Sequence, residues 1–466
     1  MISKGRYGKS NMRQSTNEIS LFETENIWRI LLRIAPPVML AQLIQALYNI
    51  VDSFFVGQYS KDGLTALSIL FPIQLVIIAI AVGTGIGVNI KMSQHYAMGE
   101  VEKAHKTAGT GTFLAVFSWF LLSIFSIWLM RTYVMTSAES LEVIEFAVTY
   151  GNIICVGSLG IFLESIWSKV HQASGNMKLP MIAQILGAIT NILLDPILIF
   201  GWGPVQGMGI AGAAYATVAG QFVAAVITIG GFYKPPKLVE IYDYVKKIYL
   251  LGYPSIFMQM LYTVYIVALN VILAGFSDSA VTVLGLYYKV QSFFFIPLSG
   301  LQTCIVPLLS YTYAQKAYER CKRIMTNTVT LSMGLMLIGV ACFELIPRQL
   351  LEIFTNDIEV LAIGEGAFRI IGLSFLPAVL SLMAPVFFQA IGAAILSVVL
   401  SVTRQIFCLI PIFWLLSKIG LNYTWWAFPI AEIVTGGLGV ILYLRQLRHW
   451  QGITFKKSKH NIKMEF

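Results

Sequence analysis

Long apolar runs separated by short polar stretches make up most of this chain of 466 residues. Each run is about as long as the twenty residues that a helix needs to cross a ~30 Å hydrocarbon layer. Twelve runs are expected to be spans, at 34–57, 64–90, 107–130, 143–168, 179–201, 209–232, 249–275, 280–308, 324–346, 361–389, 395–417 and 425–444. Hydrophobic residues reach 57%, charged residues 12% and mean hydropathy +0.74, outside the soluble range. The pattern predicts an all-α polytopic protein of the lipid bilayer.

The two halves of the chain repeat each other at one constant offset, so that position n of the first half corresponds to position n + 217 of the second. An offset that holds over most of a chain indicates a duplicated unit. Because each copy contains six spans, both copies start on the same side of the membrane and are parallel rather than inverted. We expect two pseudo-symmetric six-helix bundles with a central cleft at their interface. The matched pairs are Pro37/Pro254, Gln42/Gln259, Tyr48/Tyr265, Gln74/Gln291, Gly83/Gly300, Ser93/Ser310, Tyr96/Tyr313, Gln172/Gln389 and Gly175/Gly392.

Lysine and arginine are distributed very unevenly between the two sides of these spans. The side that holds the N-terminus carries 25 of them, and the opposite side carries four. This bias is the positive-inside signature, so both termini are expected in the cytoplasm and the chain in the cell membrane. The net charge of +9 therefore indicates orientation and predicts no nucleic-acid partner.

The repeat also sets the expected domain organisation. We expect a cytoplasmic tail at 1–33, an N-lobe at 34–232, a cytoplasmic linker at 233–248, a C-lobe at 249–447 and a second tail at 448–466. The first apolar run is too long for the core of a signal peptide. No stretch outside the spans is long enough to fold as a soluble domain. We expect the protein to function as a monomer.

Motifs for enzyme and cofactor chemistry are absent from the sequence. It contains no phosphate-binding G-x-x-x-x-G-K-[ST] motif. The glycines of the run 83–87, Gly83 and Gly87 among them, are expected to permit close helix contact. The five histidines show no metal-ligand spacing and are expected in solvated loops or tails, and the five scattered cysteines are expected to be small apolar core residues. The sequence predicts neither an enzyme nor a bound cofactor.

A polar cluster is expected in the first half alone. Asp52 and Asp195 correspond to Leu269 and Ile412 in the repeat, and intramembrane carboxylates commonly mark ion pathways. Counted along the spans, Asp52, Asp195, Tyr150 and Thr217 all lie about 8–12 Å below the outer interface. Asn191 joins them, because it precedes Asp195 by four residues and shares its helix face. Such oxygens suit Na⁺, and two neighbouring carboxylates suit a proton equally well. The alternative is that Asp52 caps its span and Asp195 only bonds to a neighbouring helix.

Four segments resemble signature motifs of the MATE (multidrug and toxic compound extrusion) transporters. They are 48–57 (YNIVDSFFVG), 175–180 (GNMKLP), 191–196 (NILLDP) and 208–217 (MGIAGAAYAT). The resemblance covers the whole chain. It implies two six-helix lobes with a central V-shaped cleft. It also implies export of organic cations or other amphiphiles by alternating access, in exchange for Na⁺ or H⁺.

The resemblance also implies roles for individual residues. In prokaryotic members with the site in the N-terminal lobe, the coupling ion is held by residues that correspond to Asp52, Asn191, Asp195 and Thr217. Na⁺ is possible at these four. Tyr150 matches less specifically, because its neighbourhood is generic.

Charged residues elsewhere in the spans are candidates for the substrate cleft. Glu432 is expected to pair with Lys289 or Arg404, to lie near the outer interface, or to form a second proton or substrate site. Glu164 could meet a cationic substrate or pair with Lys169. The cations Lys289 and Arg404 argue against a cleft that is specific for cations alone. Aligning the last spans around a shorter final loop changes the offset to 214 and places Glu432 opposite Val218.

Three functions compete at this point. An ion-coupled multidrug antiporter is favoured. A lipid-linked saccharide flippase of the related superfamily is the alternative, because those distant relatives share the two-lobe plan. Such flippases tend to line the cleft with several cations, and this chain offers Lys289 and Arg404. An integral membrane enzyme would need a reactive polar cluster at the interface, and the sequence offers none.

Overall fold

The computed structural model describes residue 22 and residues 26–137 and 140–464, most of which are helical. Most of the N-terminal tail expected at 1–33 lies outside the described residues. The chain divides into two compact units, Met1–Met260 and Leu261–Phe466. The boundary falls inside a continuous helix, α9 (Leu238–Ala274), so the stretch 233–248 expected as a linker is helical from Leu238 onward.

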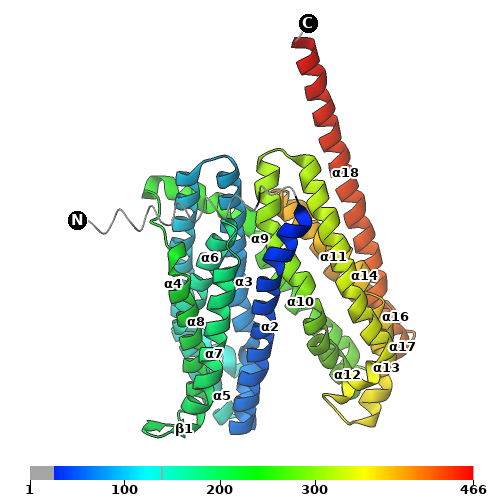
Figure 1. Ribbon diagram of the computed structural model, residues 1–466. Coiled ribbons are helices and arrows are strands. Elements are labelled where there is room, and N and C mark those ends of the chain that lie inside the picture. Colours follow the sequence, from blue (N-terminus) through cyan, green and yellow to red (C-terminus); the bar gives the residue numbers. More distant parts are fainter. Residues whose placement is uncertain (1–21, 23–25, 138–139, 465–466) are drawn as a thin grey trace, which may run out of the picture. The chain divides into compact units, whose positions relative to one another are not determined.

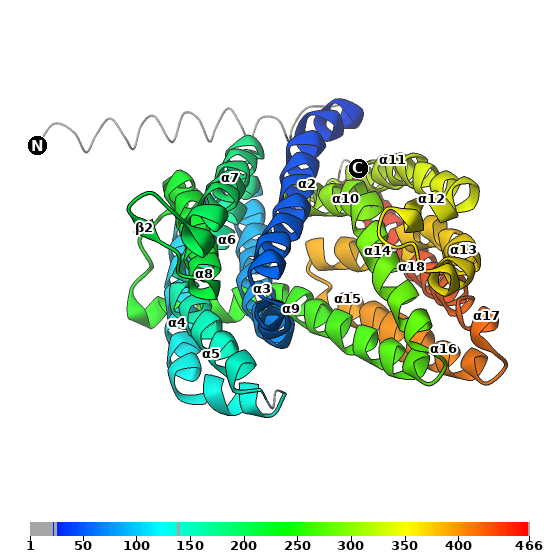
Figure 2. The same ribbon diagram turned by 90° about the horizontal axis from the view of Figure 1, so that it is seen from below.

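The first unit is a bundle of helices that run side by side (Figures 1 and 2). Its elements are α2 (Ile27–Tyr59), α3 (Lys61–Ala97), α4 (Val101–Met135), α5 (Leu141–Gly157), α6 (Leu159–Ala173), α7 (Lys178–Phe200), α8 (Ile210–Ile227), the turn η1 (Ile229–Gly231) and the first part of α9. Strands β1 (Gly201–Trp202) and β2 (Val205–Gln206) form a small antiparallel hairpin between α7 and α8. The helix α7 packs along α2 and α8, and this packing assembles the site described below.

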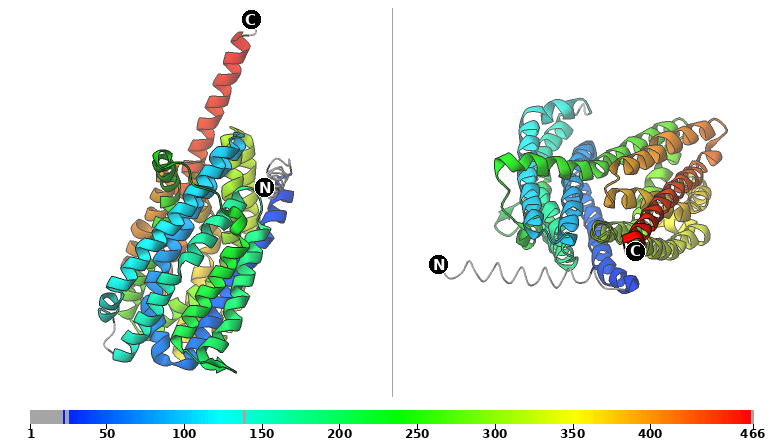
Figure 3. Two further views of the ribbon diagram at one scale, coloured as in Figure 1. Left: turned by 90° about the vertical axis from the view of Figure 1, so that its left-hand side faces the viewer. Right: turned by 90° about the horizontal axis from the view of Figure 1, so that it is seen from above.

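The second unit repeats this order of helices. It contains the rest of α9, then α10 (Asp278–Ala314), α11 (Tyr318–Leu345), α12 (Pro347–Glu352), α13 (Ile358–Gly372), α14 (Phe375–Ala390), α15 (Ala394–Val402), the π-helix η2 (Thr403–Leu409), α16 (Ile410–Ser417), α17 (Leu421–Thr424) and α18 (Ala427–Met464). The last part of α18 extends past the other helices of its unit (Figure 3), so the tail expected at 448–466 is helical as far as the structure describes it.

Twelve stretches of the described chain can cross a membrane. Ten are single spans, and the bent pairs α5/α6 and α13/α14, with angles of 41° and 55°, supply two more. Only 22–50% of each single span's most apolar window is buried within the protein. Ile127 and Trp128 on α4, for example, are 68% and 79% exposed. Apolar surface of this extent is stable in contact with lipid rather than water.

The helix boundaries follow the offset of 217 that relates the two halves of the sequence. Helix α3 runs from 61 to 97 and α10 from 278 to 314, and α8 and α18 begin at 210 and 427. The expectation that a shorter final loop reduces the offset to 214 is therefore wrong, since the stretches before α8 and α18 have equal length. Glu432 corresponds to Tyr215 rather than Val218.

Close contact between helices occurs at the glycines of the run 83–87, as expected. A Cβ atom added to Gly87 would lie 2.2 Å from the carbonyl oxygen of Ile248 in α9, and one added to Gly83 would lie 2.9 Å from the backbone nitrogen of Ile256. The expectation of solvated histidines is wrong for His95. This residue is buried in the last turn of α3 and bonds to Glu100 Oε2 at 2.7 Å, because the chain turns back after α3.

Candidate ion-binding site in the first unit

Two glycines bring α7 and α8 together at the level of the site. A Cβ atom added to Gly187 would lie 2.8 Å from the carbonyl oxygen of Gly220, and one added to Gly220 would lie 2.6 Å from that of Gly187. No residue larger than glycine fits at this approach without a backbone shift. The contact places Asn191, one turn beyond Gly187, opposite Thr217, about one turn before Gly220.

Asn191 connects the predicted ligands of α7 and α8. Its side-chain Nδ2 lies 3.3 Å from Asp195 Oδ1 and 3.3 Å from Thr217 Oγ1, donating to both oxygens. Asn191 and Asp195 are 2% and 0% exposed. The structure thus brings together three of the residues that the sequence singled out, on two helices.

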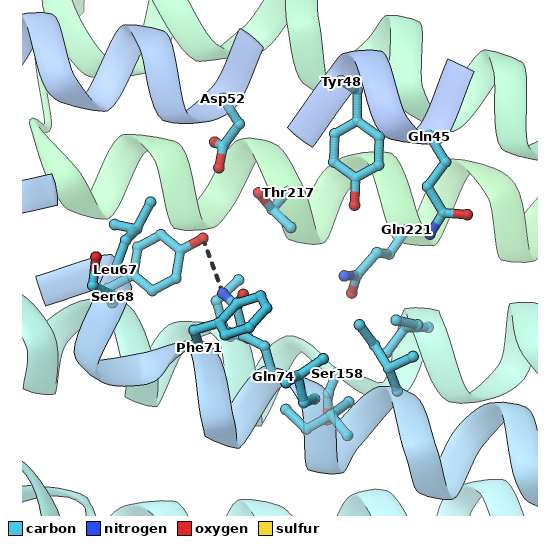
Figure 4. Close-up of a pocket in the computed structure, with 16 residues that line it drawn as sticks. Gln45, Tyr48, Asp52, Leu67, Ser68, Phe71, Gln74, Ser158, Thr217 and Gln221 are labelled. Atoms are coloured by element: carbon cyan, nitrogen blue, oxygen red, sulfur yellow. Dashed lines mark hydrogen bonds between the residues drawn. The ribbon is translucent and has the colours of Figure 1, made fainter. Parts of the chain in front are cut away.

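Asp52 and Tyr150 reach the same place from α2 and α5. Both line a cavity of about 470 Å³, together with Thr217. Figure 4 shows Asp52, Tyr48 and Gln45 projecting from α2 into this cavity. The Tyr150 hydroxyl accepts a hydrogen bond of 3.4 Å from Gln74 Nε2. Asp195 is not among the residues that line the cavity, and Asn191 and Thr217 connect it to the cavity.

The two carboxylates interact electrostatically with each other. Neither forms an ion pair with a cationic side chain in the part of the chain that the structure describes. Three oxygens here are buried without a hydrogen-bond partner among the described residues: Asp52 Oδ1, Asn191 Oδ1 and Asp195 Oδ2. Leaving one buried acceptor unpaired costs about 1–3 kcal/mol. A bound cation or proton would therefore interact with oxygen atoms that are otherwise unpaired.

The alternative that Asp52 caps its helix is wrong. Helix α2 continues for seven residues beyond Asp52, to Tyr59, and Ser60 follows as its C-cap. Asp195 likewise precedes the end of α7 at Phe200. Both acids stand inside their helices, seven and five residues before the last residue, and their depth in the membrane stays a prediction.

The corresponding positions in the second unit are apolar, and the charges there are arranged differently. Leu269, which corresponds to Asp52, is fully buried in α9. Arg404 and Glu432 form an ion pair with 2.5 Å between Nη2 and Oε1, and their side chains are only 13% and 8% exposed. This is the pairing that the sequence offered as the first alternative for Glu432. Lys289 is exposed on α10 and takes part in none of the ion pairs between described residues. A role for any of these residues in substrate binding stays a prediction.

A smaller cavity of about 90 Å³ adjoins the site and contains Glu164. Ser168 Oγ donates a hydrogen bond of 2.7 Å to Glu164 Oε1. Glu164 also interacts electrostatically with Lys169. Lys169 Nζ donates a hydrogen bond of 2.9 Å to Gln172 Oε1, and a direct pairing of Lys169 with Glu164 stays a prediction.

The sequence analysis missed several polar residues of the two cavities. Gln45, Tyr48 and Gln221 line both of them, and Gln184 lines the smaller one. Their spacing along the sequence could have identified them. Gln45, Tyr48 and Asp52 lie at i, i+3 and i+7, which places all three on one face of α2. Gln184 and Asn191 have the same seven-residue separation on α7.

The donor set limits which ion the site could hold. No group of three or more His, Cys, Asp and Glu suited to a metal ion occurs among the described residues. Carboxylate, amide, hydroxyl and phenol oxygens are hard ligands, which suit Na⁺ or a proton rather than a transition metal.

A family model described as MatE matches residues 37–197 and 254–415 of this chain. The chain belongs to the MatE family. The first residues of the two matched stretches, Pro37 and Pro254, are one of the pairs that the repeat relates, so the model recognises each copy separately. The residues Asp52, Asn191 and Asp195 all lie in the first match.

Relatives of this MatE chain match at least three quarters of its length. It is 22% identical over 445 residues to "Multidrug export protein MepA" of Staphylococcus saprophyticus, covering 92% of this chain and 96% of that protein. It is 25% identical over 371 residues to "Probable multidrug resistance protein NorM" of Thermotoga maritima, covering 75% and 77%. Both are named as multidrug transport or resistance proteins rather than enzymes, in agreement with the sequence analysis.

Solved structures share the fold. A structure described as the outward-facing conformation of a multidrug resistance MATE family transporter of the MOP superfamily matches with a TM-score of 0.86 and 21% identity, covering 93% of this chain and 98% of that chain. The predicted fold, an all-α membrane protein with two six-helix bundles, is confirmed.

Proposed function

We propose that this protein is a secondary active antiporter that exports amphiphilic or cationic small molecules in exchange for Na⁺ or H⁺. The relatives named as multidrug export and resistance proteins support the export of drugs. The observation that carries the coupling proposal is the pair Asp52 and Asp195, inside one unit, with unpartnered buried oxygens and no cationic partner among the described residues. The flippase alternative is not favoured, because Arg404 is engaged by Glu432.

The pair binds the driving ion as one unit. Keeping two carboxylates charged in a partly dehydrated site costs much free energy unless a cation lies between them. Asn191 and Thr217 provide an amide and a hydroxyl oxygen beside them, and Tyr150 contributes its phenol from the cavity wall. Binding of Na⁺ or a proton neutralises the pair and fills its free acceptor positions.

Ion binding is coupled to substrate export because the ion-bound and ion-free conformations differ in their affinity for substrate. Neutralising the pair changes how α2 packs on α7 and α8, and with it the affinity of the larger cavity for substrate. That cavity, about 470 Å³, lies in the range of about 300–1,000 Å³ typical of small-molecule sites. Export is driven when ion and substrate favour opposite conformations.

The excess of Lys and Arg on one side of the spans supports a cytoplasmic location for both termini. One chain contains all the residues of the proposed site, as a functional monomer requires.

The test is efflux of a fluorescent organic cation from proteoliposomes. A Na⁺ gradient and a proton gradient are imposed separately, each with the other held at zero. We expect one of the two to drive export at a rate well above the leak of protein-free vesicles. Equal rates with and without either gradient would contradict the antiport proposal.

A further inference from the structure

The smaller cavity is a polar passage that contains a third acid, the half-buried Glu164, and extends to Asn191 beside the acidic pair. It is lined by residues of four helices, including Gln45 and Tyr48 of α2, Glu164 of α6, Asn191 of α7 and Gln221 of α8. Gln45, Tyr48, Thr217 and Gln221 also line the larger cavity, which holds Asp52. The two cavities therefore share one polar wall.

The order of polar residues is the same along two helices. On α2, Gln45 and Tyr48 precede Asp52, and on α7, Gln184 precedes Asn191 and Asp195. At 1.5 Å per residue, Gln45 and Gln184 lie roughly 10 and 16 Å from the two aspartates towards the N-terminal ends of their helices. Those ends are the ones predicted to face the cytoplasm.

Tyr48 lines both cavities. Its hydroxyl interacts electrostatically with Asp52, with Asp195 and with Glu164. Two further buried oxygens face the passage without a described hydrogen-bond partner, Asn191 Oδ1 and Gln221 Oε1, and Asn191 is 2% exposed. A cavity that is lined by acceptors and by Glu164, and that reaches Asn191 beside the acidic pair, is chemically suited to a cation.

The volume decides which kind of cation fits. Organic substrates occupy sites of about 300–1,000 Å³, whereas one water molecule takes about 30 Å³. The cavity of about 90 Å³ thus holds an inorganic cation or a proton with one or two waters, but no drug. Lys169, which also acts on Glu164, weakens the attraction of this acid for a cation, so binding here is transient.

We propose that Glu164 is a second, transient cation subsite on the release path of the driving ion, which leaves Asp52 and Asp195 past Tyr48 towards the cytoplasm. This inference rests on the proposed function, since it assumes that the acidic pair binds the ion. Ser168 and Gln184 hold the Glu164 carboxylate in place. The exported substrate uses the larger cavity.

The experiment separates binding of the cation from its release. Equilibrium binding is measured on purified protein as retained radioactive Na⁺, and as proton uptake from a weakly buffered solution. Release is measured in proteoliposomes as cation influx coupled to export of the fluorescent substrate, with internal Na⁺ and internal pH followed in parallel. The variants are Glu164→Gln, Glu164→Asp and Tyr48→Phe. Glu145→Gln is the matched control, because Glu145 is exposed and pairs with Arg131 at 3.1 Å.

We expect Glu164→Gln to bind the cation as the wild type does and to slow coupled influx roughly tenfold, with the half-saturating substrate concentration unchanged. Glu164→Asp should recover part of the rate, and Tyr48→Phe should slow influx less. Wild-type influx in Glu164→Gln would overturn the subsite, and so would loss of equilibrium binding or a change confined to substrate affinity. If Glu164→Gln does not fold, wild-type influx in Tyr48→Phe and Glu164→Asp together would overturn it. The proposed function fails separately, if Asp52→Asn binds and transports normally.

Discussion

Arg404 and Glu432 form a buried ion pair in the second unit, where the first unit has a cavity. Arg404 Nη2 lies 2.5 Å from Glu432 Oε1, and Ser381 Oγ donates a further hydrogen bond to Glu432. In the repeat, Arg404 corresponds to Gly187 and Ser381 to Glu164. Both of these first-unit residues line the smaller cavity. The duplication has thus kept a polar passage in one copy and a closed charge pair in the other.

Replacing Glu432 with Gln should lower stability and leave ion coupling intact. The change leaves the Arg404 guanidinium buried without its counter-charge, which typically costs about 3–5 kcal/mol. Thermal unfolding of the purified protein measures the first effect, and gradient-driven efflux the second. The matched control is Glu352→Gln, which removes the exposed ion pair between Glu352 and Arg348. Loss of an exposed pair lowers the free energy of unfolding by only about 0–1 kcal/mol. Loss of transport in a Glu432→Gln protein of normal stability would instead make Glu432 a functional residue.

Replacing either Asp52 or Asp195 with Asn should abolish gradient-driven export while the protein still inserts and folds. Each change removes one of the two charges that the driving ion neutralises. Because the pair acts as one site, the double variant should be no worse than either single variant. Efflux under the gradient that drives the wild type is the measurement. Near wild-type export by Asp52→Asn would refute the coupling assignment.

Thr217→Val should weaken binding of the driving cation without abolishing export. The hydroxyl of Thr217 accepts the hydrogen bond from Asn191, and loss of one hydrogen bond of about 1 kcal/mol raises the half-saturating cation concentration roughly fivefold. The control is Thr190→Val, since Thr190 is exposed and bonds to Leu186 of its own helix. An unchanged cation dependence in Thr217→Val would exclude Thr217 from the site.

Gly87→Val should reduce the yield and thermal stability of the folded protein. Even a single Cβ atom at Gly87 would lie 2.2 Å from the Ile248 carbonyl oxygen, so α3 and α9 would have to separate. Gly334→Ala is a suitable control, because nothing lies within 4 Å of a Cβ atom added there. A helical Gly→Ala change in open space stabilises by up to about 1 kcal/mol. An unfolding temperature for Gly87→Val equal to that of the wild type would show that the contact is adaptable.

The sequence predicted those features that depend on regular spacing. Asn191 and Asp195 share a face because a helix repeats every 3.6 residues, and the apolar runs are long enough to define the spans. Gln45, Tyr48 and Gln184 were missed, because single uncharged polar residues in apolar runs carry little signal until neighbouring helices place them together. The breaks at Ser158 and at Leu373–Ser374 were missed too. No proline lies near Ser158, whereas Pro377 cannot donate a helical hydrogen bond to the Leu373 carbonyl and was an overlooked signal for the second break.

The backbone contact between Gly187 and Gly220 limits how the acidic site can change shape. With no side chain between them at this point, α7 and α8 cannot slide or rotate independently without a backbone collision. Asn191, Asp195 and Thr217 therefore form one rigid arm, and Asp52, on α2, belongs to another. The distance that can change in this site is therefore the one between α2 and the α7–α8 pair. A cation that binds both Asp52 and Asp195 would cross-link α2 and α7 reversibly. A disulfide between cysteines introduced in α2 and α7 would make the same cross-link permanent.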